Sequence, residues 1–221
     1  MQTLRIRRAT NAAAAAAVLL GMTVAAGSAQ ADEAVKPQPK SISKSGIPYR
    51  PDNEQAGPPE LVAAIRSRRT GGKLLNLDRM LLHSPNFAKG WNGMFGAIRN
   101  QLSLSPRLRE TAIMAIGVLN HAQYEWAQHE KEYLATGATP QQLSALKDVD
   151  AAARDQKRFD EAERAALALT IEMTRNVEVA EPTLKRLRAL LSDQQAVELI
   201  GTIAGYNMVS RFVVATGVEL E

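Results

Sequence analysis

The sequence contains no cysteine among its 221 residues. This absence excludes thiol nucleophiles, redox-active disulfides and thiolate metal sites. It is compatible with a stable exported protein, because about 190 residues bury an adequate core without cross-links. Strand signals are scarce as well, since β-branched residues rarely alternate with polar ones. The chain is therefore predicted to be all-α.

The N-terminal segment, residues 1–31, has the pattern of a leader peptide. Three arginines precede the apolar run NAAAAAAVLLGMTVAAG, and the segment ends in Ala29-Gln30-Ala31. A basic head, a short apolar run and an A-x-A ending are typical of a cleavable secretory signal. We therefore expect export, either to a periplasm or as a secreted protein. Because the run is short and rich in alanine, we expect no stable membrane association after cleavage. An uncleaved membrane anchor is the alternative.

Positive charge is not abundant beyond this leader. The full chain has 27 Lys and Arg residues, three of which lie in 1–31, and 23 Asp and Glu residues. The rest of the chain therefore carries 24 basic against 23 acidic residues, a net charge of +1. A nucleic-acid-binding protein needs clustered Lys and Arg, so the sequence predicts no nucleic-acid partner.

The remainder of the chain divides at a change of composition. Residues 32–58 are rich in proline, serine and charge, which predicts an extended linker or N-terminal arm. Over 59–221 the start and stop signals are those of helices. Three Ser-Pro or Thr-Pro pairs each place a capping hydroxyl before a proline at the first helical position. We therefore expect a single helical domain over 59–221.

The stretch NHAQYEWAQHE contains two of the three histidines. If one straight helix ran through it, Glu110 would lie roughly 28 Å from His129, since each residue adds about 1.5 Å. Asn120, however, is a good N-cap, and the glutamine three residues later completes a variant of the capping box. We therefore expect a break near 119–121, after which a second helix starts at His121. A turn there would bring Glu110 near His129.

If the turn forms, the stretch supplies acid–base chemistry. Glu110 lies amid TAIMAIG, so we expect a partly buried carboxyl group whose pKa is raised by burial, which suits proton transfer. His129 is then the natural relay between Glu110 and a substrate. Two structural alternatives stay open at this point. Glu110 pairs with an arginine such as Arg107, or His129 is an ordinary half-buried histidine.

The other polar and aromatic residues of the stretch also have simpler interpretations. Tyr124 and Trp126 belong to residue types that are more often core than walls of a substrate pocket. His121, Glu125 and His129 recur every four residues, but helical metal sites usually take further ligands from other helices, and the chain shows no second such element. We therefore expect no metal.

At these residues the chain resembles the carboxymuconolactone decarboxylase family, which includes the alkylhydroperoxidase D-like proteins. The resemblance rests on RLRETAIMAIGVLNHAQYEWAQHEKEYLATGAT at 107–139 and continues through most of 60–221. It implies an all-α fold of the alkylhydroperoxidase D-like type, assembled into homotrimers or homohexamers with sites near subunit contacts. The decarboxylase side of the family implies no cofactor and a small-molecule substrate.

The resemblance also assigns roles to individual residues. The peroxidase branch uses a glutamate, a Cys-x-x-Cys pair with a histidine inside it, and a following histidine. The glutamate and the final histidine match Glu110 and His129. The two cysteines match Ala122 and Glu125, and the inner histidine matches Tyr124. The disulfide relay of that branch is therefore expected to be absent.

The cysteine-free side of the family implies loss of CO2 from a lactone acid by proton transfer. Glu110 and His129 are then the expected catalytic pair. Tyr124 or His121 would hold a substrate carboxylate or enolate oxygen. The rest of the substrate-binding set is expected at Glu125 and Trp126.

We rank three functions. The first is a cofactor-free acid–base lyase or isomerase that acts on a small carboxylated lactone or oxo acid. The second is a non-enzymatic exported oligomer that binds a ligand or partner on the same fold. The third is a hydroperoxide-handling antioxidant protein, which the missing cysteines argue against.

Overall fold

The computed structural model describes residues 42–221, so the predicted leader and the start of the predicted arm lie outside the described residues. Helices account for nearly all regular structure in this part, and the only β-type pairing there is an isolated bridge between Ile42 and Pro48. The helices are α1 (Pro59–Arg66), α2 (Asn76–Leu81), α3 (Pro85–Asn100), α4 (Pro106–Leu119), α5 (Gln123–Ala135), α6 (Pro140–Ala145), α7 (Val149–Ala152), α8 (Glu161–Arg175), α9 (Glu181–Leu190) and α10 (Asp193–Thr216), with short 3-10 turns at Glu54–Ala56 and Thr70–Gly72. The predicted all-α fold is confirmed.

Proline and a capping hydroxyl start several of these helices. Ser105 accepts a hydrogen bond from the backbone N–H of Leu108 at the start of α4. Thr139 and Gln142 form a reciprocal capping box at the start of α6. Ser84 precedes the proline of α3 without a side-chain cap bond. Fixed proline φ angles and satisfied N–H groups thus set where these helices begin.

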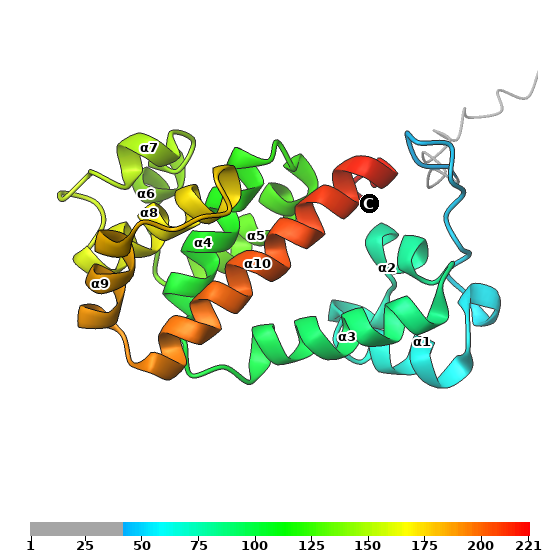
Figure 1. Ribbon diagram of the computed structural model, residues 1–221. Coiled ribbons are helices and arrows are strands. Elements are labelled where there is room, and N and C mark those ends of the chain that lie inside the picture. The colour runs from blue at the N-terminus through cyan, green and yellow to red at the C-terminus, as the bar shows by residue number, and fades with distance from the viewer. Residues whose placement is uncertain (1–41) are drawn as a thin grey trace, which may run out of the picture. The chain divides into compact units, whose positions relative to one another are not determined.

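Helix α4 lies at the centre of the described part. It packs against α5, α8 and α10, and Figure 1 shows α10 crossing in front of it. The middle of α4 is an unbroken buried run, Ala112 to Ile116, because helices cover it on several sides. One apolar cluster joins α4 to α1, α3 and α10, and a second joins it to α5, α7 and α8. Any side chain on α4 is therefore held by packing from several directions.

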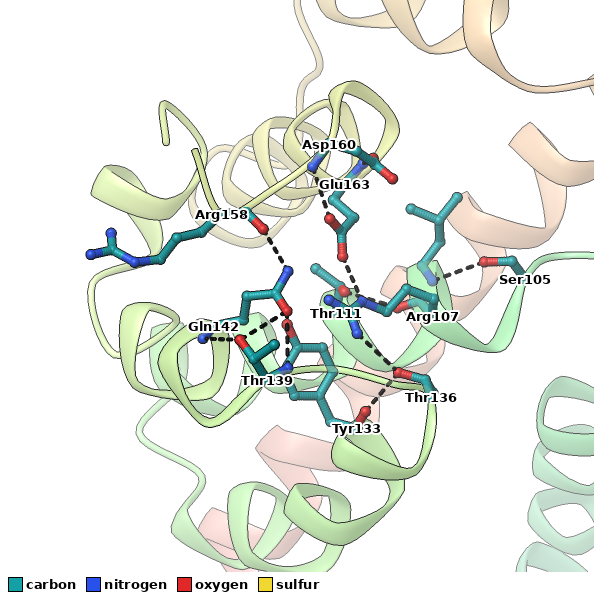
Figure 2. Close-up of polar contacts among 11 residues, drawn as sticks. Ser105, Arg107, Thr111, Tyr133, Thr136, Thr139, Gln142, Arg158, Asp160 and Glu163 are labelled. Atoms are coloured by element: carbon teal, nitrogen blue, oxygen red, sulfur yellow. Dashed lines mark hydrogen bonds and ion pairs between the residues drawn. The ribbon is translucent and has the colours of Figure 1, made fainter. Parts of the chain in front are cut away.

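A polar cluster fastens the first turn of α4 to its neighbours (Figure 2). Arg107 donates to the carboxylate of Glu163 on α8 at 2.5 Å, and it lies over the ring of Tyr133 at 5.0 Å. Arg107 also contacts the hydroxyl of Thr136, just after α5, at 3.4 Å. Arg107 is therefore not the arginine that pairs with Glu110, and the neighbouring Arg109 takes that place instead.

Helix α10 leaves part of its apolar surface uncovered. The side chains of Val197 and Val214 are 68% and 54% exposed. None of the helices described for residues 42–221 is long and apolar enough to cross a membrane. Assembly with further copies of the chain, which the family resemblance implies, stays a prediction.

The described part of the predicted arm lies against the helical body. Tyr49 and Ala56 are buried, and the backbone N–H of Lys44 donates to the carbonyl of Gly217 at 3.2 Å. Gly217 ends α10 with φ +62°, and a Cβ there would lie 2.8 Å from the Cβ of Lys44. Only glycine suits both the backbone angle and this close approach. The chain after α10 therefore passes close to the backbone around residue 44.

Candidate active site

A tight turn joins α4 to α5. Ala122 donates its backbone N–H to the carbonyl of Gly117 at 2.8 Å, and His121 donates to that of Val118 at 3.1 Å. With His121 at φ +55°, these bonds make a Schellman turn, which reverses the chain direction directly after α4. The expected break near 119–121 is therefore present, and its left-handed position is filled by histidine rather than glycine.

The prediction that Asn120 is the N-cap of the second helix was wrong. Asn120 ends α4 instead of starting the next helix, and its side-chain amide donates to Asn207 and Ser210 on α10. Helix α5 begins at Gln123 rather than at His121. The reason is the left-handed conformation of His121, which places Asn120 in the last turn of α4 and leaves its side chain facing α10.

The two helices pack closely after the turn. A Cβ on Gly117 would lie 3.4 Å from the backbone nitrogen of Trp126, so glycine permits a short distance between the helix backbones. Glu110 lies in the second turn of α4, and His129 lies in the second turn of α5. The turn therefore brings together two residues that are 19 positions apart.

Glu110 and His129 form a buried hydrogen-bonded pair. Their side chains are 1% and 3% exposed, and His129 Nδ1 lies 2.7 Å from Glu110 Oε2. Arg109 donates from Nε to the other carboxylate oxygen of Glu110 at 3.1 Å. An ionised carboxylate only accepts hydrogen bonds, so Nδ1 carries the hydrogen in this pair. The opposite ring nitrogen, Nε2, is then left to meet whatever lies on the other side.

Glu125 occupies that other side. Its Oε2 lies 3.7 Å from His129 Nε2, and its side chain is as buried as that of Glu110. The ring of Tyr206 packs against His129 edge-on, with centroids 5.2 Å apart, and fixes the plane of the imidazole. The structure therefore contains a row of three groups, Glu110, His129 and Glu125, with the histidine in the middle.

The two carboxyl groups of this row titrate in opposite directions. Burial would raise the pKa of Glu110, but the hydrogen bond and charge of His129, together with Arg109, outweigh it and lower the pKa. Burial dominates at Glu125 and raises its pKa, although His129 and two arginines oppose the shift. The raised pKa expected for Glu110 is thus wrong, because the contacts with His129 and Arg109 stabilise its charge by more than burial penalises it. Glu110 is the ionised member and Glu125 the one that tends to be protonated.

A pocket of about 390 Å³ opens beside His129 and Glu125. Helices α3, α5 and α10 and the segment between α1 and α2 supply its walls, while Glu110 lies behind His129 and does not line it. The apolar part of the wall consists of Leu74, Leu75, Leu77, Trp91, Phe95, Tyr206 and Val209. The pocket therefore combines an apolar wall that includes aromatic rings with a titratable pair at one side.

Charged side chains of both signs line the rest of the pocket, among them three arginines and the carboxylate of Glu132. Arg69 forms two hydrogen bonds with Asp78, at 2.8 and 2.6 Å, and Arg99 lies 3.8 Å from Glu132. Arg68 donates to the amide oxygen of Asn92 rather than to a carboxylate. Its pKa is lowered by burial and by the neighbouring Arg69. The charges of Arg69 and Arg99 are thus largely balanced by carboxylates, and Arg68 is the arginine most available to a negatively charged ligand.

Tyr124 and Gln128 line the pocket one position before Glu125 and His129 on α5. Tyr124 O–H donates to Oε1 of Glu221 at 3.2 Å, and Gln128 Nε2 donates to Oε2 of Glu221 at 2.7 Å. Burial raises the pKa of Tyr124, as does the negative charge of Glu221, so the hydroxyl stays protonated and acts as a donor. A carboxylate of the chain itself thus lies in the pocket.

Two of the expected binding residues lie elsewhere. His121 and Trp126 line a separate pocket, together with Lys147, on the other side of the α4–α5 turn. His121 is exposed at the left-handed position of the turn, and Trp126 packs against the second apolar cluster instead of lining the pocket beside His129. The expectation of one pocket for all six residues is therefore corrected, and Glu110, His129, Tyr124 and Glu125 are the ones brought together.

Several pocket residues were not expected from the sequence. Gln128 could have been found, because it follows Tyr124 by four positions on the same helix. Tyr206 and Glu221 come from distant parts of the chain and had no local signal. Within residues 42–221, no group of three or more His, Asp and Glu side chains is placed to hold a metal ion.

Comparison with known proteins identifies the domain type. Residues 85–172 match the model of the carboxymuconolactone decarboxylase family. This matched range includes both Glu110 and His129. A comparison with curated proteins gave no match.

Solved structures share the fold at low sequence identity. A peroxidase-related protein from Silicibacter sp. TM1040 has a TM-score of 0.68 and 17% identity, over 85% of this chain and 95% of its own. An alkylhydroperoxidase AhpD core protein from Ralstonia eutropha JMP134 has a TM-score of 0.66 and 19% identity, over 78% and 92%. The debrominase Bmp8 in complex with 2,3,4-tribromopyrrole has a TM-score of 0.65 and 20% identity, over 78% and 91%. These matches confirm the alkylhydroperoxidase D-like fold.

Proposed function

Because residues 85–172 of this chain belong to the carboxymuconolactone decarboxylase family, we propose that the pocket catalyses proton transfer on a small carboxylated lactone or oxo acid, without a cofactor. The observation that carries the proposal is the row Glu110, His129, Glu125, in which one histidine lies between two buried carboxyl groups whose pKa values are shifted in opposite directions. Loss of CO2 from the substrate is the leading reaction, as the family name suggests.

Each member of the row has a distinct part in this chemistry. Glu110 does not line the pocket, so it acts through His129 by holding the Nδ1 hydrogen and supporting positive charge on the ring. Glu125 lines the pocket, and burial raises its pKa and favours its protonated form, so we assign it as the group that donates a proton to the substrate carbon. His129 Nε2 then returns a proton to Glu125 or accepts one from the substrate.

The balance of the reaction is simple. The bond between the substrate carbon and its carboxylate breaks and CO2 leaves, while the electron pair stays on carbon as an enolate conjugated to a carbonyl. A proton from Glu125 forms the new C–H bond, and a solvent proton restores Glu125 through His129. The aromatic wall of Trp91, Phe95 and Tyr206 limits the water that competes for the enolate.

The alternative antioxidant function finds no support in the chain. A thiol peroxidase needs a cysteine that is oxidised and then reduced, and the sequence has none. Glu125 stands where the resemblance places one of the two cysteines. The same pocket therefore retains the acid and base but lacks the redox group.

Deuterium exchange tests the proposal without requiring the natural substrate. Purified protein is incubated in D2O with carboxymuconolactone and a panel of small oxo acids, and proton NMR follows both exchange at the carbon next to the carbonyl and loss of the carboxylate. We expect exchange or decarboxylation of at least one compound. His129→Gln and Glu125→Gln should each slow it about a hundredfold or more, since general acid–base catalysis contributes roughly 10² to 10⁴.

A matched control uses the same chemical change outside the pocket. Glu178 is exposed in the loop before α9, so Glu178→Gln should leave the rate unchanged. If no compound reacts, or if His129→Gln and Glu125→Gln both retain the wild-type rate, the proposed chemistry is wrong. The second-ranked function, ligand binding without catalysis on the same fold, would then be favoured.

A further inference from the structure

A carboxylate of the chain itself lies in the same pocket as Glu125 and His129, although the proposed reaction does not use it. The Glu221 side chain accepts hydrogen bonds from three groups: Tyr124 O–H at 3.2 Å, Gln128 Nε2 at 2.7 Å and the backbone N–H of Asn76 at 2.6 Å. Two of these donors, Tyr124 and Gln128, line the pocket together with Glu221 itself. A carboxylate held by three converging donors marks a place where carboxylates bind.

The donors belong to the same helix as the acid–base pair. Tyr124 and Gln128 are neighbours across one turn of α5, and so are Glu125 and His129. Successive residues on a helix are rotated by about 100°, so the two pairs form adjacent rows facing the same pocket. A ligand whose carboxylate contacts the first row therefore places the adjoining carbon atoms against the second.

The segment that carries Glu221 is fixed more firmly before it than at its end. The backbone N–H of Glu219 donates to Tyr49 O–H at 2.9 Å, and its carbonyl accepts from the side-chain amide of Asn76 at 3.1 Å. Leu220 is 53% exposed, and the Glu221 side chain is exposed on its open side. Displacing Glu221 therefore breaks its own three hydrogen bonds but does not disturb the buried core.

We propose that Tyr124, Gln128 and the backbone N–H of Asn76 form a subsite for a ligand carboxylate, and that Glu221 fills this subsite until such a ligand displaces it. This inference deepens the proposed function and rests on it for the assumption that the pocket receives a carboxylated substrate. It adds the residues that recognise the carboxylate, and an internal competitor that any ligand must displace.

Direct binding measurements test the subsite. Isothermal titration calorimetry uses benzoate as the probe, because its flat ring suits the aromatic wall, and benzamide as the uncharged probe of equal shape. The apparent Kd of a ligand is its intrinsic Kd divided by the fraction of protein that is competent to bind. If Glu221 fills the subsite about nine-tenths of the time, Glu221→Ala should bind benzoate roughly tenfold more tightly than the wild type. Benzamide affinity should change by less than about twofold, because an amide replaces the carboxylate poorly at three donors.

Further variants separate the subsite from a general effect of the tail. Leu220→Ala alters the same segment without touching the carboxylate and should leave benzoate binding unchanged. In the Glu221→Ala background, Gln128→Ala and Tyr124→Phe should each remove most of the gain for benzoate. Thermal unfolding of every variant checks that the helices remain folded.

Three results would overturn the inference. Equal benzoate affinity in the wild type and Glu221→Ala, including no binding by either, would show that Glu221 does not compete for a carboxylate site. An equal gain for benzoate and benzamide would show that the tail only obstructs the pocket. A gain that survives both Gln128→Ala and Tyr124→Phe would place the carboxylate elsewhere. None of these results affects the deuterium-exchange test, which depends on Glu125 and His129 and is measured separately.

Discussion

Replacement of Glu110 by glutamine isolates the electrostatic part of the buried row. The variant keeps the shape of the side chain but removes its negative charge. In the wild type one carboxylate oxygen contacts His129 and the other contacts Arg109, both at hydrogen-bond distance. The glutamine amide has a single acceptor oxygen, so one of these donors loses its partner inside the protein.

The size of the effect follows from burial. Hydrogen bonds to a charged group are worth roughly 1.5 to 3 kcal/mol, and breaking a buried charged pair costs roughly 3 to 5 kcal/mol. We therefore expect Glu110→Gln to lower the free energy of unfolding by about 3 kcal/mol at pH 7. For a domain of this size that corresponds to a fall in Tm of about 6 to 12 °C.

The pH dependence gives a sharper signature than the magnitude. The pKa of Glu110 is lowered in the folded protein from its ordinary value of 4.5, so its stabilising contribution is complete above that value. It is lost as the pH falls through the lower, folded-state pKa. The destabilisation caused by Glu110→Gln should therefore be constant from about pH 6 to 8 and shrink steadily below about pH 4.5.

Glu125→Gln is the matched variant, and its effect on stability should change with pH in the opposite direction. The pKa of Glu125 is raised in the folded protein, so its contribution is complete below 4.5 and is lost as the pH rises through the folded-state pKa. The wild type should therefore lose stability relative to Glu125→Gln as the pH increases. The pH dependence of unfolding of the two variants thus reports the direction in which the pKa of each carboxyl group is shifted.

Urea unfolding followed by circular dichroism, repeated from pH 3.5 to 8, provides the assay. Parallel pH curves for the two variants would refute the assignment of one ionised and one protonated carboxyl group. A cost below about 1 kcal/mol for Glu110→Gln at pH 7 would show that the His129 and Arg109 contacts contribute little net stability.

Three further substitutions test the surrounding framework. His121→Gly should raise the free energy of unfolding by about 1 kcal/mol in thermal unfolding, because glycine adopts the left-handed angle without strain, and it should leave activity unchanged if the side chain lies outside the pocket. Gly217→Ala should lower the Tm by several degrees and weaken the tail, because its new Cβ would clash with Lys44, and a mobile tail would appear as faster amide hydrogen exchange. Asp78→Asn should cost roughly 3 kcal/mol in urea unfolding, since it leaves the Arg69 guanidinium without its bidentate partner.

The fold was largely predictable from local pattern. Helix starts at Pro106 and Pro140 follow from a hydroxyl and a proline in sequence, and these signals depend on neighbours only a few residues away. The reversal after α4 was also predicted, but from the capping tendency of Asn120, whereas the structure uses a left-handed His121. Several local conformations can reverse the chain at the same position. The predicted position of the turn was therefore right, while the predicted hydrogen bonds within it were wrong.

The candidate site was only partly predictable for a different reason. The pairing of Glu110 with His129 needed one turn, which the sequence indicated. The direction of the Glu110 pKa depended on whether burial or the hydrogen bond and charge of His129 were stronger, with a smaller contribution from Arg109, a neighbour that does not usually face the same way on a helix. Glu221 contacts Tyr124 across 97 positions, and only the path of α10 and the tail brings them together. Contacts of that kind have no local signal in a single sequence.

The Schellman turn between α4 and α5 also fixes how the segment tolerates changes of length. One residue inserted between the turn and His129 would rotate the imidazole by about 100° around the helix axis and shift it by about 1.5 Å. The ring would then no longer point at Glu110 on α4, even though every side chain had been retained. The spacing of 19 positions is therefore as much a part of this site as the residues at its two ends, and insertions are expected only in outlying connections such as the loop before α9.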